Sequence, residues 1–413
     1  MTSSIAVLSF TSARPARHLL GCAAVLAVFG FIFSIGRAET IPTPASTAVA
    51  PPPPVAASAP VPAAPSSDLS FYGDFRVRYE WDWDSQNAAG VARTDRDRAR
   101  LRVRLGANYK LSSDWSLSAR VRTGNKLSQQ SPHLTFSSND GLTDDFAIQL
   151  DRYFVQFKQS AFSAWGGRNV SPFWQQNEFL VDDDVTLTGV AGTYETKLDH
   201  GTVATTVGAF YLPDGMNDLN GTLVGGQIKY ALSVKPSQFV FAAGLYQFDG
   251  KNGAKNLRNR NGARDYLIGV LNAQWIEPLS NGLPLTLGAD FFNNFENYSA
   301  ADAAPFAPSH AGQTTGYVLS VQVGQLKKPH DWQVGYYYAH IGTFAVNASY
   351  SEDDWARFGN AAQSDLTDIK GHEFRASYVI MKNLNITSRV FFVEAITSQQ
   401  DGKRCRIDLN WKF

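Results

Sequence analysis

Apolar and polar residues alternate along most of this chain with the two-residue period of a β-strand. In the clearest segment, residues 69–83, Phe75 and Val77 share one face, whereas Arg76 and Arg78 share the other. Similar segments recur to the last residue, and none has the pattern of an amphipathic helix. They lie near residues 97–112, 114–124, 146–158, 161–170, 184–196, 202–212, 221–234, 237–249, 264–277, 283–296, 313–325, 331–343, 369–381, 383–396 and 402–413. The pattern predicts an all-β antiparallel fold of about 16 strands (about 14–18), an even number that returns the chain to its starting side.

The connections between these segments alternate in length from one end of the chain to the other. The short ones are residues 112–113, 158–161, 198–201, 235–236, 278–282, 327–330 and 381–383. The long ones are residues 84–96, 125–145, 171–183, 213–220, 250–263, 297–312, 344–368 and the brief 397–401. Short periplasmic turns and long outer loops are typical of a transmembrane β-barrel, whereas a soluble β-sandwich has no reason to sort its loops in this way. We therefore predict a transmembrane barrel over residues 69–413.

The residues before the predicted barrel divide into two segments. Residues 1–38 have the features of a cleaved signal peptide: Arg14 and Arg17, an apolar stretch over 19–35, and small residues at the end. A retained transmembrane helix is the alternative, because the apolar stretch approaches a spanning length. Residues 39–68 are rich in proline and alanine and predict a disordered, extended periplasmic linker.

Composition narrows the class of protein further. The mean hydropathy of −0.21 is too low for a helical membrane protein, yet aromatic residues make up 13% of the chain, as the interface girdles of a barrel require. Removing residues 1–38 removes three of the 37 basic residues and leaves 37 acidic ones, so the formal charge becomes −3 and a nucleic-acid partner is not expected. The histidines lack the spacing of metal ligands, and the motifs of hydrolases and nucleotide-binding enzymes are absent. No catalytic residue, metal site or cofactor is predicted.

Eight arginines occupy the inward phase of the first three predicted strands. They are Arg76, Arg78, Arg98, Arg100, Arg102, Arg104, Arg120 and Arg122. Arginine keeps its charge and is costly to bury without a partner, so this face must meet water or carboxylates. The arginines are therefore the candidate basic wall of a water-filled lumen.

Candidate acidic partners lie in the third long loop, which contains Glu178, Asp182, Asp183 and Asp184. These carboxylates are available as the anions that could face the basic wall. At the other end of the chain, residues 405–413 alternate strictly and finish with Trp411 and Phe413. This pattern resembles the closing strand of bacterial outer-membrane barrels, whose terminal aromatic residue is recognised by the barrel-assembly machinery.

Several short motifs support a more specific resemblance, which spans essentially all of residues 69–413. They are the arginine strand 98–104 and segments 119–124 (ARVRTG), 150–153 (LDRY), 167–173 (GRNVSPF) and 183–189 (DDVTLTG). With the aromatic terminus, they resemble the putative porin family of Gram-negative outer membranes. In porins the third outer loop folds into the lumen and sets an acidic edge opposite a basic cluster, so the resemblance implies that Glu178, Asp182, Asp183 and Asp184 form the acidic side of a constriction.

The resemblance implies a passive, water-filled diffusion channel for small hydrophilic solutes, exported to the Gram-negative outer membrane. Because the arginines outnumber the loop carboxylates, we expect a preference for anions. The implied partners are outer-membrane lipid and lipopolysaccharide, the assembly machinery, small solutes or ions, and two further copies of the chain in a homotrimer. The alternatives are a channel specific for an acidic oligosaccharide or polysaccharide, a barrel adhesin or anchor, and an outer-membrane hydrolase.

Overall fold

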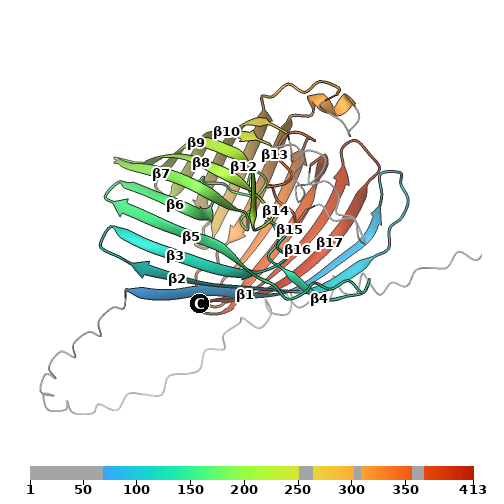
Figure 1. Ribbon diagram of the computed structural model, residues 1–413, viewed down its shortest axis with the longest axis horizontal. Helices are drawn as coiled ribbons and strands as arrows, with labels where there is room; N and C mark the ends of the chain where they lie inside the picture. The colour runs from blue at the N-terminus through green and yellow to red at the C-terminus, as the bar shows by residue number, and fades with distance from the viewer. Residues whose placement is uncertain (1–67, 251–263, 302–307, 356–366) are drawn as a thin grey trace, which may run out of the picture. The chain divides into compact units, whose positions relative to one another are not determined.

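The computed structural model describes residues 68–250, 264–301, 308–355 and 367–413. The expected signal peptide and all but the last residue of the expected linker lie outside these residues. The described chain forms one antiparallel sheet, which closes on itself because β1 pairs with β2 on one side and with β17 on the other (Figure 1). The predicted all-β barrel is therefore confirmed.

Sixteen long strands make up the barrel wall, as predicted. They are β1 (Leu69–Gln86), β2 (Arg96–Lys110), β3 (Trp115–Thr123), β5 (Ile148–Gln159), β6 (Phe162–Val170), β7 (Thr186–Leu198), β8 (Gly201–Asp214), β9 (Asp218–Val234), β10 (Ser237–Asp249), β11 (Tyr266–Pro278), β12 (Pro284–Asn294), β13 (Thr315–Gly324), β14 (Trp332–Ile341), β15 (Ile369–Met381), β16 (Leu384–Ala395) and β17 (Asp401–Lys412). Among the described residues, the other elements are the short strand β4 (Leu134–Ser138) and the 3₁₀ helix η1 (Pro308–Gly312). In the described part of the chain, no helix has the length and apolar character needed to cross a membrane.

Two long connections differ from the sequence prediction. Strand β4 lies within the predicted loop 125–145 and pairs with Arg98–Leu101 of β2. Strand β3 ends at Thr123 and pairs with β2 only from Arg104 onward, so β4 satisfies backbone groups of β2 that would otherwise form an open edge. The predicted loop 213–220 shrinks to residues 215–217, because β8 and β9 continue as a hairpin whose pairing reaches Asp214 and Asp218.

The two faces of the wall differ as the alternation of β1 predicts. Phe71 and Tyr79 are 74% and 48% exposed on the outside, whereas Glu80 and Asp82 are buried on the inside. Exposed apolar side chains continue around the outer surface, where they suit a lipid environment.

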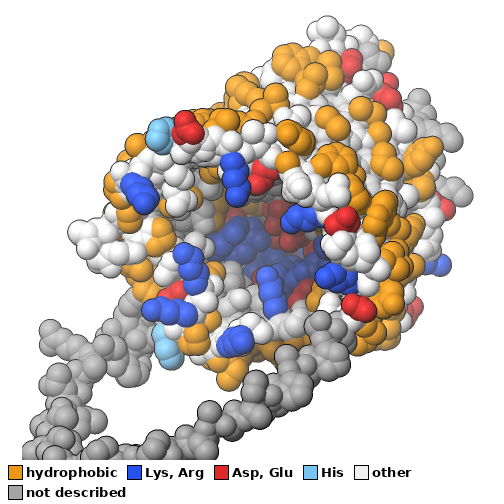
Figure 2. Space-filling view, turned by 90° about the vertical axis from the view of Figure 1, so that its left-hand side faces the viewer, with side chains coloured by type: hydrophobic (Ala, Val, Ile, Leu, Met, Phe, Trp, Pro, Cys, Tyr) orange, Lys and Arg blue, Asp and Glu red, His pale blue; other side chains and the backbone are white. Residues whose placement is uncertain are grey.

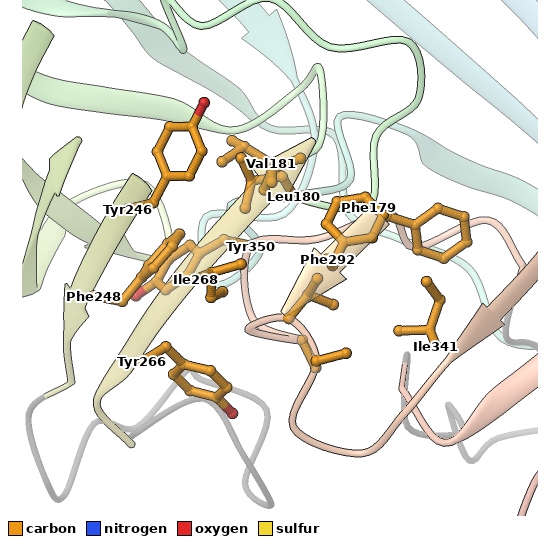
Figure 3. Close-up of a cluster of buried hydrophobic side chains, with 14 of the residues drawn as sticks. Phe179, Leu180, Val181, Tyr246, Phe248, Tyr266, Ile268, Phe292, Ile341 and Tyr350 are labelled. Atoms are coloured by element: carbon orange, nitrogen blue, oxygen red, sulfur yellow. The ribbon is translucent and has the colours of Figure 1, made fainter. Parts of the chain in front are cut away.

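The inside of the barrel is divided into a charged part and an apolar part. Strands β1–β3 and β15–β17 direct charged side chains inward, whereas strands β8–β13 direct apolar ones inward, among them Phe248, Tyr266 and Phe292. The long connections 171–185 and 342–355 fold against this apolar part (Figure 3). Phe179 of the first and Tyr350 of the second are fully buried there. The sequence analysis did not predict this interior core. Because the core fills the apolar part of the barrel, the remaining interior space is lined by the charged part.

Candidate functional site

The eight predicted arginines all lie on the interior side of β1, β2 and β3. Six are buried, and Arg76 and Arg98 are half-buried. The register places Arg76 directly opposite Arg102, and Arg78 directly opposite Arg100. Viewed from the end that carries the short turns, the barrel shows a hollow lined by basic side chains with acidic ones behind them (Figure 2). Like charges directly opposite each other destabilise a sheet, so this wall needs compensating anions.

Carboxylates of the wall itself provide much of this compensation. Asp74 on β1 accepts hydrogen bonds from Nε of Arg102 at 3.0 Å and Nε of Arg104 at 2.6 Å. Glu80 on the same strand forms an ion pair with Arg98. Further interior ion pairs join Arg96 and Arg404 to Asp82, Arg120 to Asp151, and Arg78 to Asp408.

Asp184 is the one carboxylate of the predicted loop cluster that contacts the arginine wall within the described chain. Its side chain accepts from Nη1 of Arg104 at 2.6 Å and lies 3.4 Å from Nη1 of Arg102. Arg122 donates to the Asp184 backbone carbonyl at 3.1 Å. Burial raises the pKa of Asp184, but Arg102 and Arg104 outweigh that effect and lower it to about 2.

The other three carboxylates of this loop meet further acidic groups instead. Carboxylate oxygens of Glu178, Asp182 and Asp183 lie within 4.8 Å of one another, and Glu178 forms a second such group with Glu352 and Asp354. Burial and the neighbouring carboxylates raise the pKa of Glu178 and of Asp182 well above the usual range. Oxygen-only donor sets of this kind are those that Ca²⁺ accepts. The loop therefore has one carboxylate on the basic wall and three in an acidic cluster.

Asp354, on the connection 342–355, lies between arginines of three strands. Its carboxylate forms ion pairs with Arg406 and, at 2.7 Å, with Nη1 of Arg389, and Nη1 of Arg78 lies 3.8 Å away. Arg404 donates to its backbone carbonyl at 2.7 Å. Burial opposes ionisation here, yet the surrounding arginines hold the pKa of Asp354 well below its ordinary value. The connection is thus fixed to the charged part of the wall.

Two polar cavities lie along the charged part of the barrel. One, of about 280 Å³, is lined by basic groups including Arg76 and Arg389 and by acidic groups including Glu178 and Asp183. The other, of about 260 Å³, lies beside the arginines at the start of β2. Ser131 and His133 line both cavities, so the segment that contains them separates the two spaces.

This segment, residues 124–133, folds into the barrel and is bonded to the connection 342–355. Nε2 of Gln129 donates to the Ser349 carbonyl at 2.8 Å, and Nε2 of Gln130 donates to the Ser351 carbonyl at 2.5 Å. Together with residues 171–185, these segments form a constriction of three connections, where the sequence analysis expected only the third loop.

Trp411 and Phe413 lie on the outside, where they are 50% and 46% exposed. Their ring centroids are 5.3 Å apart. Phe413 exchanges backbone hydrogen bonds of 3.0 and 3.1 Å with Gly73. Both aromatic side chains are thus at the junction between β17 and β1, and neither faces the cavities.

A sequence comparison decides the family. The model of a family described as putative porin matches residues 86–265 and 262–413. The chain belongs to this family. Since the matched segments include nearly the whole barrel, the resemblance inferred from the motifs is confirmed. No curated protein matches the porin.

One solved structure supports the fold of this porin, and a second is reported beside it. The OprB structure of Pseudomonas putida at high pH has 13% sequence identity and a TM-score of 0.54, covering 84% of this chain and 94% of that one. Salmonella typhi OmpF, in a complex with daunomycin, has 15% identity and a TM-score of 0.48, covering 84% and 97%. At these identities the likeness concerns the fold. The assignment as an outer-membrane channel protein rests on the family match.

Several interior residues of the porin were not among the predicted site residues. They are Asp74, Glu80, Asp82, Arg96, Asp151, Glu352, Asp354, Glu373, Arg389, Arg404, Arg406 and Asp408. The alternation of the first and last strands could have identified those on β1 and β17, because they share the phase of the inward arginines. Nothing periodic marks Glu352 or Asp354, which lie in a long connection.

Proposed function

We propose that this porin is a passive diffusion channel for small hydrophilic solutes with a preference for anions. The observation that carries the proposal is the set of arginines in each cavity lining: Arg96, Arg98 and Arg100 line one, and Arg76, Arg78 and Arg389 line the other, where carboxylates are also present. Fixed charges along a narrow passage set ion selectivity. An anion crossing the constriction would meet arginines along its whole path.

The interior also contains many carboxylates, so the sign of the preference depends on their ionisation. Arginine keeps its proton in any interior environment. The crowded loop carboxyls behave differently: burial, followed by the adjacent Asp354, raises the pKa of Glu352 to about 8, and the pKa values of Glu178 and Asp182 are also raised. Near neutral pH these groups carry less negative charge than their number suggests. The balance therefore favours anions.

Among the alternatives, a channel for acidic polysaccharides fits this interior less well. A polyanion would have to pass Glu178 and Asp183, which line the same cavity as Arg76. The cavities of about 260 and 280 Å³ each hold roughly nine water volumes. This space suits small solutes.

The test is the zero-current potential of single channels in a planar bilayer under a KCl gradient. Arg76 has no carboxylate within ion-pair distance among the described residues and donates to Asn410 at 2.5 Å, so Arg76→Gln leaves no acidic partner unpaired. At about 7 Å in a water-like dielectric, one charge contributes roughly 0.6 kcal/mol, so the chloride-to-potassium permeability ratio should fall at least about threefold. Lys382→Gln, in the exposed turn between β15 and β16, is the control. An unchanged potential in Arg76→Gln, with conductance retained, would refute the assignment of Arg76 to the ion path.

The remaining expectations belong to the same proposal. Residues 1–38 would be removed on export, and N-terminal sequencing of the outer-membrane protein tests this. The porin would be a homotrimer in lipid and lipopolysaccharide, so its detergent-solubilised mass should correspond to three copies. Trp411 and Phe413 would serve recognition by the assembly machinery, because they lie outside the ion path.

A further inference from the structure

The cavity of about 280 Å³ has opposite charges on its two sides. Arg76 lines it from β1, and Glu178 and Asp183 line it from the connection 171–185. Arg76 and Asp183 interact electrostatically, but among the described residues they form no ion pair within 4.0 Å. Glu178 likewise has no basic partner at that distance among the residues the structure describes. Unlike the neighbouring Asp184, these three groups have no ion-pair partner within 4.0 Å among the described residues.

His133 supplies a second, independent indication that the cavity takes a ligand. Its side chain is only 5% exposed, it lines the same cavity, and its Nε2 has no hydrogen-bond partner in the described structure. A buried polar nitrogen without a partner is costly. Burial and the nearby Arg78 and Arg100 lower the pKa of His133 well below its ordinary value, so the ring is neutral and one of its nitrogens can donate to an acceptor.

We propose that this cavity selects small zwitterions of the α-amino acid class. The ligand carboxylate would lie at Arg76 and His133, and its ammonium group at Glu178 and Asp183. This inference rests on the proposed channel function and names the solute class of the same passage. A zwitterion matches both sides at once, whereas a simple anion leaves the acidic side uncompensated and a simple cation leaves the basic side uncompensated.

The size of the cavity agrees with this class. A volume of about 280 Å³ corresponds to roughly nine water molecules. This number is comparable to the number of non-hydrogen atoms in a small amino acid. Burial and the adjacent Asp183 raise the pKa of Glu178 in the empty cavity, and an ammonium group beside it would favour its charged form. Ligand binding would thereby relieve the crowding of like charges.

The experiment measures initial uptake into proteoliposomes at pH 7 with four solutes of nearly equal size: alanine (zwitterion), lactate (anion), alaninamide (cation) and lactamide (neutral). Chloride conductance of the same preparation gives the number of active channels. We expect alanine to enter at least threefold faster than lactamide. We also expect added alanine, but not added lactamide, to reduce the single-channel chloride current. Equal uptake of alanine and lactamide would overturn the inference.

Variants separate the two sides of the cavity. Glu178→Gln combined with Asp183→Asn should reduce alanine uptake to the level of lactamide while lactate uptake rises. Arg76→Gln should slow alanine and lactate together. Asp199→Asn, an exposed carboxylate in the turn between β7 and β8, is the matched control and should retain the alanine preference. If the double variant keeps the preference, the inference is wrong.

These outcomes also distinguish the inference from the proposed function. A channel that conducts chloride selectively but treats alanine like lactamide would refute zwitterion selection alone. Absence of conductance with every solute would refute the channel proposal as well. The folding of each variant is checked by the change in its gel mobility on boiling. His133→Ala removes no charge and provides a second variant, which should also weaken the alanine preference.

Discussion

Replacing Asp354 with asparagine tests what holds the connection 342–355 inside the barrel. Asp354 forms ion pairs with Arg406 and Arg389, whose side chains are only 1% and 10% exposed. Removing one partner of a buried ion pair costs about 3–5 kcal/mol, because the remaining charge is left uncompensated. If this were the main anchor, the variant would release the connection and widen the passage.

The apolar contacts of the same connection contribute more stabilising free energy in total than the ion pairs of Asp354. Phe344, Val346 and Tyr350 are fully buried in the interior core, and Trp355 is 4% exposed. Burying each such side chain contributes about 1.5–3 kcal/mol, or about 6–12 kcal/mol for the four. This exceeds the loss at Asp354, so the connection should stay in place in Asp354→Asn. The variant then removes one negative charge from the lumen without opening it.

The assay compares single-channel conductance and zero-current potential in a KCl gradient. Asp354→Asn should keep a conductance within about twofold of the original, while its chloride preference rises at least about threefold from the lost charge. The double variant Tyr350→Ala and Trp355→Ala should instead increase the conductance several-fold with less change in selectivity. A several-fold conductance increase in Asp354→Asn, matching that of the double variant, would refute the reasoning that apolar packing holds the connection.

Three further predictions follow from the same interior. Because the pKa of Glu352 is raised to about 8, this carboxyl takes up its proton as the pH falls from 9 to 7, so chloride preference should increase over that range. The zero-current potential should therefore change in a step between these pH values, and Glu352→Gln should abolish the step. A step that persists in Glu352→Gln would belong to another group. Phe413→Ala should lower the folded fraction on unboiled gels while leaving single-channel conductance unchanged, because Phe413 lies outside the lumen beside Gly73; normal folded levels would show that this side chain is dispensable for assembly. Gln129→Ala combined with Gln130→Ala removes hydrogen bonds between the segment 124–133 and its partner connection and should increase current fluctuations in single-channel records; quiet channels would show that these bonds do not restrain the segment.

The barrel wall could be predicted from the sequence because its signals are local. In β1 the side chains alternate between lipid and lumen, so the facing of Arg76 and Tyr79 follows from position alone. The short turns between neighbouring strands fix which strands pair. Strand β10 shows where this reasoning weakens: Phe241 and Leu245 face outward and Tyr246 and Phe248 face inward, so both faces are apolar and the alternation disappears.

The constriction could be predicted only in part, for a physical reason. The third long loop was expected in the lumen, and in the structure Asp184 at its end lies against Arg102 and Arg104. The partners of Asp354, in contrast, are separated from it by long stretches of chain, and nothing in a connection indicates which wall its side chains will meet. Such contacts depend on tertiary packing, which has no period in the sequence.

The packing of the interior core also explains why the charged residues line a narrow passage. In an empty barrel of sixteen strands, arginines on β2 would lie far from the opposite wall, and water would screen them from most passing ions. Here the apolar faces of β8–β13 hold the connections 171–185 and 342–355 against one side of the barrel. The carboxylates of these connections face the charged side. On the proposed path, each solute would therefore pass close to fixed charges of both signs. In the proposed channel, the apolar half of the barrel therefore affects selectivity through position, because it holds the connection that carries Asp183 beside the cavity that Arg76 also lines.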